Sequence, residues 1–345
     1  MHVLVCPVSG GAFPVQLGFM IETAKLRSDT CRILPFYDVA LASSGGNLAT
    51  YIAMGGDFTS IGIEGVVNKM SPSIYLSSWW PKPFSSVIPS WTIGYYKGSL
   101  YDRGNGGEKL FEDLFTYDTI GKLEVWTGTL NRSKGKAEIF TNLCEGESRI
   151  NTNRFLHERL NAMPLNYARR DPKTIARISY ASAAIPVLIP SVKMDDCYYV
   201  DGGTAYSSPL TPLQDCLKVN HEENLHIDYL SSYDLESSDK LTSYSNIVQN
   251  SSFSLGEIIK SLGIQDRLSG IELVGDGNVK VELGSCKDGE LAEIYSRRLK
   301  MRKSFLELYP DKSIQVPLES FTPKDIIDKI QLARKSMMYR LWYTE

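Results

Sequence analysis

Residues 39–47 of the chain read VALASSGGN, and this short stretch decides the class of fold. Its first four residues are apolar and predict a strand that is buried in a sheet. The residues that follow lead into a predicted helix at residues 47–54, which ends at two glycines. A strand that passes into a helix through a tight turn of small residues is typical of an α/β fold.

The turn in this stretch has the spacing of a nucleophilic serine. Such a serine needs small residues two positions before and after it, because the backbone there is tight and strained. With Ser44 as the nucleophile, Ala42 and Gly46 take those positions. With Ser43 as the nucleophile, Leu41 would take the first of them, and leucine is too large. The sequence therefore predicts Ser44 as the catalytic serine.

A second turn of small residues comes earlier in the chain. Residues 3–6 predict the first strand, and Ser-Gly-Gly-Ala follows at residues 9–12. Consecutive small residues let backbone N–H groups converge on an anion, as an oxyanion hole requires. Gly10, Gly11 and Ala12 are therefore candidate oxyanion-hole residues. The alternative is simply a tight turn from a strand into a helix.

A third turn follows a predicted strand at residues 198–200. It consists of Asp201, Gly202 and Gly203. A turn aspartate commonly accepts hydrogen bonds from nearby backbone N–H groups, which would make its role structural. The alternative is a general base, because a partly desolvated carboxylate beside a serine can accept the serine proton.

Together the three turns resemble those of the patatin-like phospholipase family. They come in that family's order, and residues 181–186, ASAAIP, are similar to its small-residue segment. The resemblance covers about residues 1–235 and implies a three-layer α/β/α sandwich with a mostly parallel central sheet. It also implies that Ser44 is acylated and that Asp201 is its general base. The expected reaction is hydrolysis of fatty acyl esters in phospholipids or related glycerolipids.

Two features depart from the family pattern. The family's glycine turn normally continues with a cationic residue and another glycine, where this chain has Phe13 and Pro14. Ala42 also replaces the first glycine of the serine turn. Losing one oxyanion donor costs on the order of 3 kcal/mol of transition-state stabilisation, so a catalytically weak or inactive lipid-binding or scaffold protein is an alternative. If the missing charge limits turnover, Phe13→Arg would raise kcat.

The histidines allow a different mechanism. The chain has four, and His226 lies on a predicted strand at residues 225–230. It follows Asp201, which gives the order Ser, Asp, His of the α/β-hydrolases. A Ser44–Asp201–His226 esterase is therefore a second alternative. Against it, those enzymes place the nucleophile after several strands, and a histidine in an apolar strand is usually packed in the core.

The segments between the motifs support an α/β chain. Residues 123–130 and 137–143 alternate around a polar turn and predict a hairpin. Apolar residues at helical spacing predict a helix around residues 175–181. Residues 71–101 mix aromatic residues with prolines and predict an irregular segment. That segment is either a lid or interfacial patch, or a set of rings packed over the core.

The last third of the chain lies beyond the resemblance. Residues 236–345 are predicted to form a mostly helical extension, packed on a catalytic domain of residues 1–235. Residues 231–255 are polar and predict a loop, and the pattern from residue 291 onward predicts helix. The cationic run at residues 297–303 is either a solvated helix face or a contact for anionic lipid head groups.

The net charge, the cysteines and the apolar runs of the chain limit the kinds of partner that we expect. The net charge is −3 over 345 residues, which gives no electrostatic reason to bind nucleic acid. Six scattered cysteines lack metal-ligand spacing, so we expect reduced thiols, no metal and no cofactor. The N-terminus does not resemble a signal peptide, and no apolar run approaches the roughly 18 residues of a membrane span. We expect a cytoplasmic protein that contacts membranes only peripherally, and the sequence leaves its oligomeric state open.

Overall fold

The structure is a computed structural model, and its described residues form an eleven-stranded sheet and six α-helices. The described residues are 1–9, 12–29, 37–43, 50, 67, 112, 123–150, 165–168, 171–184, 186, 190–206, 208–220, 224–234, 255–275, 278–286, 290–312, 314 and 322–344. The predicted helix at residues 47–54 lies outside them except for residue 50, and so do the irregular segment at 71–101 and most of the loop at 231–255.

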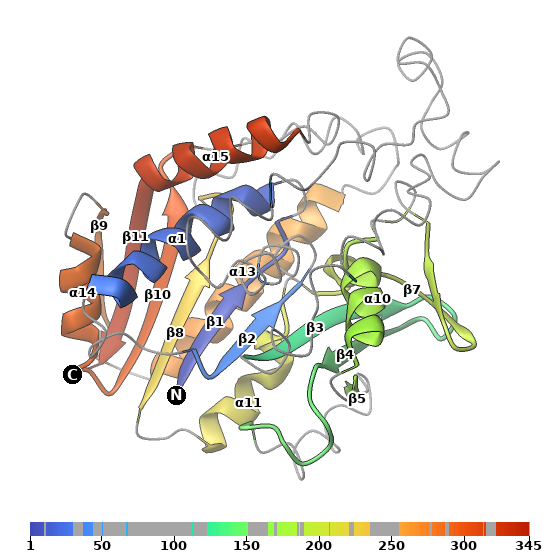
Figure 1. Ribbon diagram of the computed structural model, residues 1–345. Helices are drawn as coiled ribbons and strands as arrows, with labels where there is room; N and C mark the ends of the chain where they lie inside the picture. Colours follow the sequence, from blue (N-terminus) through green and yellow to red (C-terminus); the bar gives the residue numbers. More distant parts are fainter. Residues whose placement is uncertain are drawn as a thin grey trace.

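Eleven strands of the described residues form one mixed sheet (Figure 1). The main order is β5-β4-β3-β2-β1-β8-β10-β11-β9, and β7 pairs with β3 and β6. The strands are β1 (His2–Cys6), β2 (Val39–Ala42), β3 (Glu124–Asn131), β4 (Lys136–Thr141), β5 (Leu165–Tyr167), β6 (Val192–Met194), β7 (Cys197–Asp201), β8 (Leu225–Leu230), β9 (Lys280–Ser285), β10 (Lys303–Pro310) and β11 (Met337–Thr344).

The centre of the sheet is parallel. Strands β3, β2, β1, β8 and β10 are neighbours in that order, and every pair among them is parallel. Antiparallel pairs occur on the two flanks, where β4 and β7 pair with β3, and β11 pairs with β10 and β9. All four residues of β2 and all six of β8 are buried, because helices cover both faces of a parallel sheet. This burial explains the continuous apolar run at residues 39–42.

Helices lie on both faces of the sheet, as the sequence predicts. They are α1 (Phe13–Asp29), α10 (Pro172–Ser182), α11 (Leu210–Asn220), α13 (Leu255–Val274), α14 (Glu290–Arg298) and α15 (Pro323–Lys335). Alternate residues of β1 point to opposite faces. Leu4 and Cys6 join the core with α1, α10, α14 and α15, whereas Val3 and Val5 join the core with α11 and α13. The three-layer α/β/α architecture is confirmed.

The ends of two helices follow directly from their sequence. Asp171 accepts a hydrogen bond from the Thr174 N–H at 3.0 Å and caps α10, and Pro172 is the first helical residue. α15 begins in the same way, since Thr322 accepts from the Asp325 N–H at 3.1 Å. The predicted helix around residues 175–181 is therefore confirmed, with its start set by a cap rather than by its apolar spacing.

The predicted helical character from residue 291 onward is wrong for residues 303–310 and 337–344. Residues 303–310 form β10 and residues 337–344 form β11, and both lie in the same sheet as β1. Seven of the eight residues of β10 are buried, so the strand shows no polar alternation, and the cations before it resemble a polar helix face. The helices α13, α14 and α15 agree with the expected extension, but residues 236–345 also complete the sheet. The division at residue 235 stays a sequence prediction.

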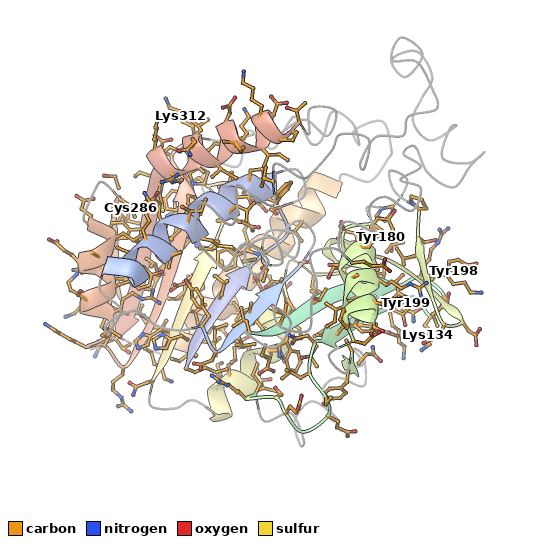
Figure 2. The ribbon with its side chains drawn as sticks, viewed as in Figure 1. Lys134, Tyr180, Tyr198, Tyr199, Cys286 and Lys312 are labelled. Atoms are coloured by element: carbon orange, nitrogen blue, oxygen red, sulfur yellow. The ribbon has the colours of Figure 1, made fainter. Side chains whose placement is uncertain are left out.

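Two hairpins lie beside each other at the β3 flank. The hairpin of β3 and β4 is confirmed, whereas the pairing of β6 with β7 was not predicted. The Arg132 N–H donates to the Tyr198 carbonyl oxygen at 2.7 Å, and the Tyr198 N–H donates to Ser133 Oγ at 2.9 Å. Figure 2 shows Lys134 and Tyr198 on the same side of the molecule. The two hairpin ends therefore form one surface.

Candidate active site

The ends of β1 and β2 bring two of the predicted turns together. The strands are parallel, and Cys6 lies opposite Ala42 at their carboxyl ends. The Ser43 N–H donates to the Cys6 carbonyl oxygen at 3.1 Å. In open α/β sheets the carboxyl edge of the parallel strands is where ligands bind. The glycine turn after β1 and the serine turn after β2 therefore begin side by side at the functional edge.

β7 brings Asp201 to the same edge. Asp201 lies opposite Thr129 of β3, and β3 runs parallel to β2 with Thr127 opposite Ala42. Asp201 thus lies about two residues beyond the end of β2, or roughly 7 Å along the strand direction. The structure therefore places Asp201 at the edge of the sheet where β1 and β2 end.

The two glycines after Asp201 make this approach possible. A Cβ at Gly202 would lie 2.4 Å from the Gly128 carbonyl oxygen of β3, so no side chain fits there. A Cβ at Gly203 would lie 2.7 Å from the side chain of Val8, in the turn after β1. The Asp-Gly-Gly turn is therefore packed directly against Val8, the residue before the predicted glycine turn.

The Asp201 carboxylate is held in place by its own turn. It is 5% exposed, and Oδ1 accepts a hydrogen bond from the Gly203 N–H at 2.6 Å. The Asp201 N–H donates to the Ala184 carbonyl oxygen at 2.9 Å, and Ser182 Oγ donates to the Gly128 carbonyl oxygen at 2.7 Å. The family-like segment at residues 181–186 thus supports the turn from beneath. The structural role that the sequence allowed for Asp201 is confirmed, and it orients the carboxylate.

Of the two serines after β2, the structure describes Ser43 but not Ser44. Ser43 is fully buried, and its Oγ lies 3.4 Å from the Tyr206 carbonyl oxygen, to which it donates. Its hydroxyl therefore points into the molecule. Ser44 lies outside the described residues, as do Gly10, Gly11 and Gly46. Their predicted roles stay predictions.

The turn after β1 uses one of the predicted oxyanion donors for itself. The Ala12 N–H donates to the Ser9 carbonyl oxygen at 2.8 Å, which closes the turn into α1. The prediction that Ala12 supplies an oxyanion donor is therefore not supported. α1 begins at this edge, so the positive end of its dipole lies beside the turn.

Phe13 and Pro14 have a structural explanation. Phe13 is 1% exposed and belongs to the core between the sheet and its helices. Pro14 lies in the first turn of α1, where a missing N–H leaves no helical hydrogen bond unmade. The departure from the family pattern therefore replaces a cation near the site by a core side chain.

Gln16 is a site-supporting residue that the sequence reasoning missed. It is fully buried on α1, and its Nε2 donates to the carbonyl oxygens of Pro7 and Leu230, both at 3.0 Å. It thereby ties the glycine turn to the end of β8. An amide among the apolar positions of a helix is the signal that would have found it.

The chain matches the family model described as patatin-like phospholipase over residues 9–213, a range that includes all three turns. The chain belongs to the patatin-like phospholipase family. No curated protein sequence matches the chain. Among solved structures, the chain is similar to the crystal structure of VipD from Legionella pneumophila, with 12% sequence identity and a TM-score of 0.34, over 97% of this chain and 67% of that chain. The family assignment rests on the family match, and it makes the chain a lipid acyl hydrolase at the level of the family.

His226 does not join the candidate site of this patatin-like phospholipase. It lies opposite His2, at the amino-terminal end of β1, and the two rings stack with centroids 4.9 Å apart. The site lies past Cys6, four strand residues or about 13 Å away along β1. His226 Nδ1 lies 2.9 Å from Ser304 Oγ, and burial lowers the pKa of its imidazole to about 3. The Ser44–Asp201–His226 triad is therefore wrong, because the register places His226 at the opposite edge.

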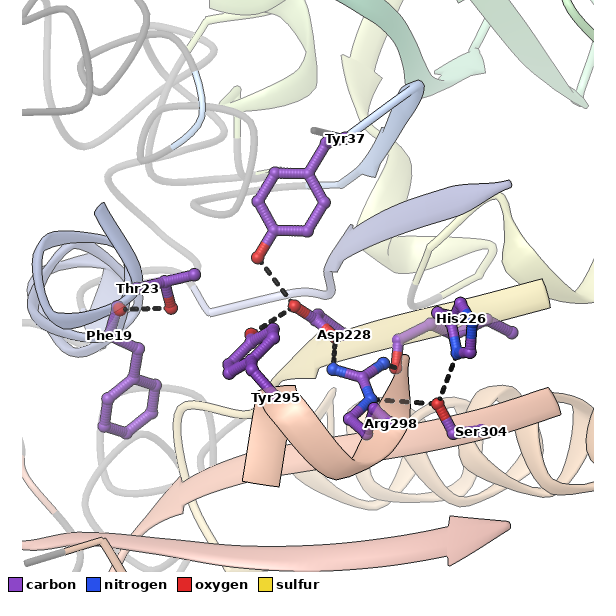
Figure 3. A network of polar contacts seen from close by, with 9 residues as sticks. Phe19, Thr23, Tyr37, His226, Asp228, Tyr295, Arg298 and Ser304 are labelled. Carbon is purple, nitrogen blue, oxygen red and sulfur yellow. Dashed lines mark hydrogen bonds and ion pairs between the residues drawn. The ribbon is translucent and has the colours of Figure 1, made fainter. Parts of the chain in front are cut away.

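A buried polar network follows His226 along β8 (Figure 3). Asp228 Oδ2 accepts hydrogen bonds from Tyr295 and, at 2.7 Å, from Tyr37, and Asp228 Oδ1 pairs with Arg298. Arg298 Nε donates to Ser304 Oγ at 2.9 Å. This network fixes α14 and β10 to β8. The interpretation of residues 297–303 as a solvated helix face is therefore wrong for Arg298, whose side chain is 3% exposed.

The described part of the chain offers no cluster of histidine, cysteine, aspartate or glutamate side chains that could hold a metal ion. Within the same residues, none of the helices combines the length and the apolar character needed to cross a membrane.

Proposed function

We propose that this member of the patatin-like phospholipase family hydrolyses acyl esters of phospholipids or related glycerolipids through Ser44 and Asp201. The observation that carries the proposal is that β1, β2 and β7, the strands that lead into the three turns, reach one edge of the sheet. Ser43 N–H reaches Cys6, and Gly203 packs on Val8. Ser44 follows Ser43 directly in the chain, which supports its proposed role beside Asp201.

The first half of the reaction would acylate Ser44. Its Oγ forms a bond to the ester carbonyl carbon while the proton passes to the Asp201 carboxylate. A carboxylate held away from bulk water is a stronger base than a solvated one. The N–H groups of Gly10 and Gly11, together with the positive end of α1, would stabilise the oxyanion. The alcohol leaves as the ester C–O bond breaks, and it takes the proton from Asp201.

The second half would release the fatty acid. A water molecule attacks the acyl carbon and gives its proton to Asp201. Ser44 Oγ leaves and recovers a proton from the same carboxyl group. The dyad needs no third residue, which agrees with the position of His226 at the other edge of the sheet.

Labelling with a fluorophosphonate probe tests the proposal, because the probe requires an activated serine. We expect one label per chain, on the peptide that contains Ser44, and release of free fatty acid from phospholipid vesicles. A folded protein that is not labelled and releases no fatty acid would contradict the proposal.

A weak or inactive lipid-binding protein is the second candidate. Two observations favour it: the Ala12 N–H is engaged in its own turn, and Phe13 is buried where the family has a cation. Both reduce the stabilisation available to an oxyanion. Lipid binding without fatty acid release or probe labelling would identify this second function.

A further inference from the structure

The two hairpins at the β3 flank project past the carboxyl edge of the sheet, on the side of the candidate site. β7 leads directly into Asp201, and β3 continues to Asn131, two residues beyond the Thr129 that pairs with Asp201. The described residues 132–136 and 193–198 form the ends of these hairpins, and we call them the hairpin surface. Hydrogen bonds of Tyr198 to Arg132 and to Ser133 hold the two ends together.

The hairpin surface is locally cationic in a chain of net charge −3. Its exposed cations are Arg132, Lys134, Lys136 and Lys193. They outnumber its two exposed acids, Asp195 and Asp196, which lie together at the β6–β7 turn. Lys134 Nζ lies 3.6 Å from the buried Glu138 carboxylate, yet its side chain stays 57% exposed. The surface therefore presents positive charge to solvent.

An exposed aromatic ring lies among these cations. Tyr198 is 46% exposed and lies opposite Lys193 across the β6–β7 hairpin. Its neighbour Tyr199 is buried, so β7 alternates between solvent and core at this end (Figure 2). A tyrosine beside long cationic side chains is the combination that suits a lipid head-group layer, where the ring is apolar and its hydroxyl stays hydrated.

The distance from this ring to the candidate site suits a lipid substrate. Tyr198 and Asp201 are three strand residues apart, or about 10 Å. The head-group layer on one side of a bilayer is roughly 5–8 Å thick. A ring held in that layer would place the Asp201 carboxylate close to the ester bonds of a phospholipid that is partly drawn out of the bilayer.

We propose that the hairpin surface docks this protein on bilayers that contain anionic lipid, with Tyr198 in the head-group layer. The inference rests on the proposed function, because docking would bring the candidate site to its lipid substrate. The cationic run at residues 297–303 is the competing surface. It lies at the amino-terminal edge of the sheet, where the Leu225 N–H donates to the Arg302 carbonyl oxygen at 3.1 Å, so docking there would turn the site away from the bilayer.

The test is sedimentation with vesicles of phosphatidylcholine alone or mixed with phosphatidylserine. It uses the Ser44→Ala full-length chain, so that lipid is not consumed. We expect binding to the mixed vesicles that weakens as salt is raised. Arg132→Gln with Lys134→Gln should weaken it on the order of 25-fold, since each cation near an anionic surface contributes roughly fivefold.

Lys300→Gln with Arg302→Gln is the matched control, because it removes one lysine and one arginine, both exposed, at the opposite edge. It should bind like the parent. Equal losses in the two double variants, or a larger loss in the control, would overturn the proposal. So would binding to single-stranded RNA in place of vesicles. Thermal unfolding of each variant checks its fold, and Lys136→Gln with Lys193→Gln repeats the test on the other two cations.

Tyr198→Ser tests the ring separately from the charge. It should weaken vesicle binding at high salt as well as at low salt, because the contribution of the ring is not screened. A Tyr198→Ser chain that binds like its parent would remove the ring from the proposal. Vesicle binding does not depend on Ser44, so a protein that binds through the hairpin surface but hydrolyses nothing contradicts only the proposed function. Hydrolysis without such binding contradicts only the docking proposal.

Discussion

Ser43 and Ser44 are adjacent, and of the two only Ser43 belongs to the described residues, where its hydroxyl makes a hydrogen bond. Ser43 Oγ donates to the Tyr206 carbonyl oxygen in a fully buried position. We predict that Ser44→Ala abolishes acyl hydrolysis and fluorophosphonate labelling. Ser43→Ala should keep much of both and lower the free energy of unfolding by about 1 kcal/mol, the usual contribution of one hydrogen bond. Labelling that persists in Ser44→Ala and disappears in Ser43→Ala would reverse the assignment.

Asp201 combines a structural and a proposed catalytic role, and one substitution separates them. In Asp201→Asn the amide oxygen can still accept from the Gly203 N–H, so the turn should stay folded. The amide cannot take the serine proton, and loss of a general base costs roughly a hundred- to ten-thousand-fold in rate. We therefore predict that the variant folds and that its kcat is lower by that factor. His226→Ala is the control, and it should keep substantial activity where it remains folded. A folded His226→Ala chain as inactive as Asp201→Asn would contradict the dyad.

Phe13 shows how the structure changes a prediction made from the sequence. The sequence suggested that Phe13→Arg would restore a missing charge and raise kcat. Because Phe13 is 1% exposed in the core, the substitution would bury an unpaired guanidinium and remove a packed ring. We now predict a fall in the thermal unfolding midpoint and no gain in kcat, with Phe13→Leu as the milder control. A stably folded Phe13→Arg chain with a raised kcat would restore the first interpretation.

At the scale of elements, the starts of β1 and β8 form a pH-sensitive contact. His2 stacks on His226, and burial lowers the pKa of their imidazoles to about 4 and about 3 from an ordinary 6.5. Below pH 6.5 the two histidines bind protons in the unfolded chain but not in the folded chain. The free energy of unfolding therefore falls as the pH is lowered. The contribution is fully present above 6.5 and declines toward pH 3–4.

We predict that the thermal unfolding midpoint falls between pH 6.5 and 4, and that His2→Gln with His226→Gln flattens this part of the curve. Buried carboxylates act in the same range, so the comparison with the double variant isolates the histidines. Parallel curves for the two proteins would show that the stacked pair does not titrate as proposed.

At the scale of the whole molecule, the family match ends earlier in the chain than the sheet does. The match ends at residue 213, whereas β10 pairs with β8 along six residues and continues the sheet to β11 and β9. Removing residues 236–345 would leave the fully buried β8 as an open edge. It would also leave Asp228 without Arg298, and breaking a buried ion pair in this way costs about 3–5 kcal/mol.

We therefore predict that residues 1–235 alone do not fold, whereas the full chain unfolds in one cooperative transition. Circular dichroism and calorimetry of the two proteins measure this. A soluble, cooperatively folded fragment of residues 1–235 that releases fatty acid would show that the predicted domain boundary is real.

Several elements could be predicted from their own residues. The continuous apolar run at residues 39–42 matches β2, because a parallel strand buried on both faces favours apolar residues throughout. Residues 225–230 match β8, which is also buried throughout, although it carries His226 and Asp228 among its apolar residues. The Asp201 turn was found for a related reason. Its two glycines are needed because neither has room for a side chain: Gly202 lies against the backbone of Gly128, and Gly203 lies against the side chain of Val8.

The sequence by itself predicted the strands β1, β2, β3, β4, β7 and β8 and the three turns of small residues, since these features depend on neighbouring residues. Only the tertiary structure decided that His226 lies at the far edge and that Arg298 is buried against Asp228. Each of these depends on strand register or on contacts formed in packing. The local pattern of side chains does not show which distant residues will contact them in the folded chain.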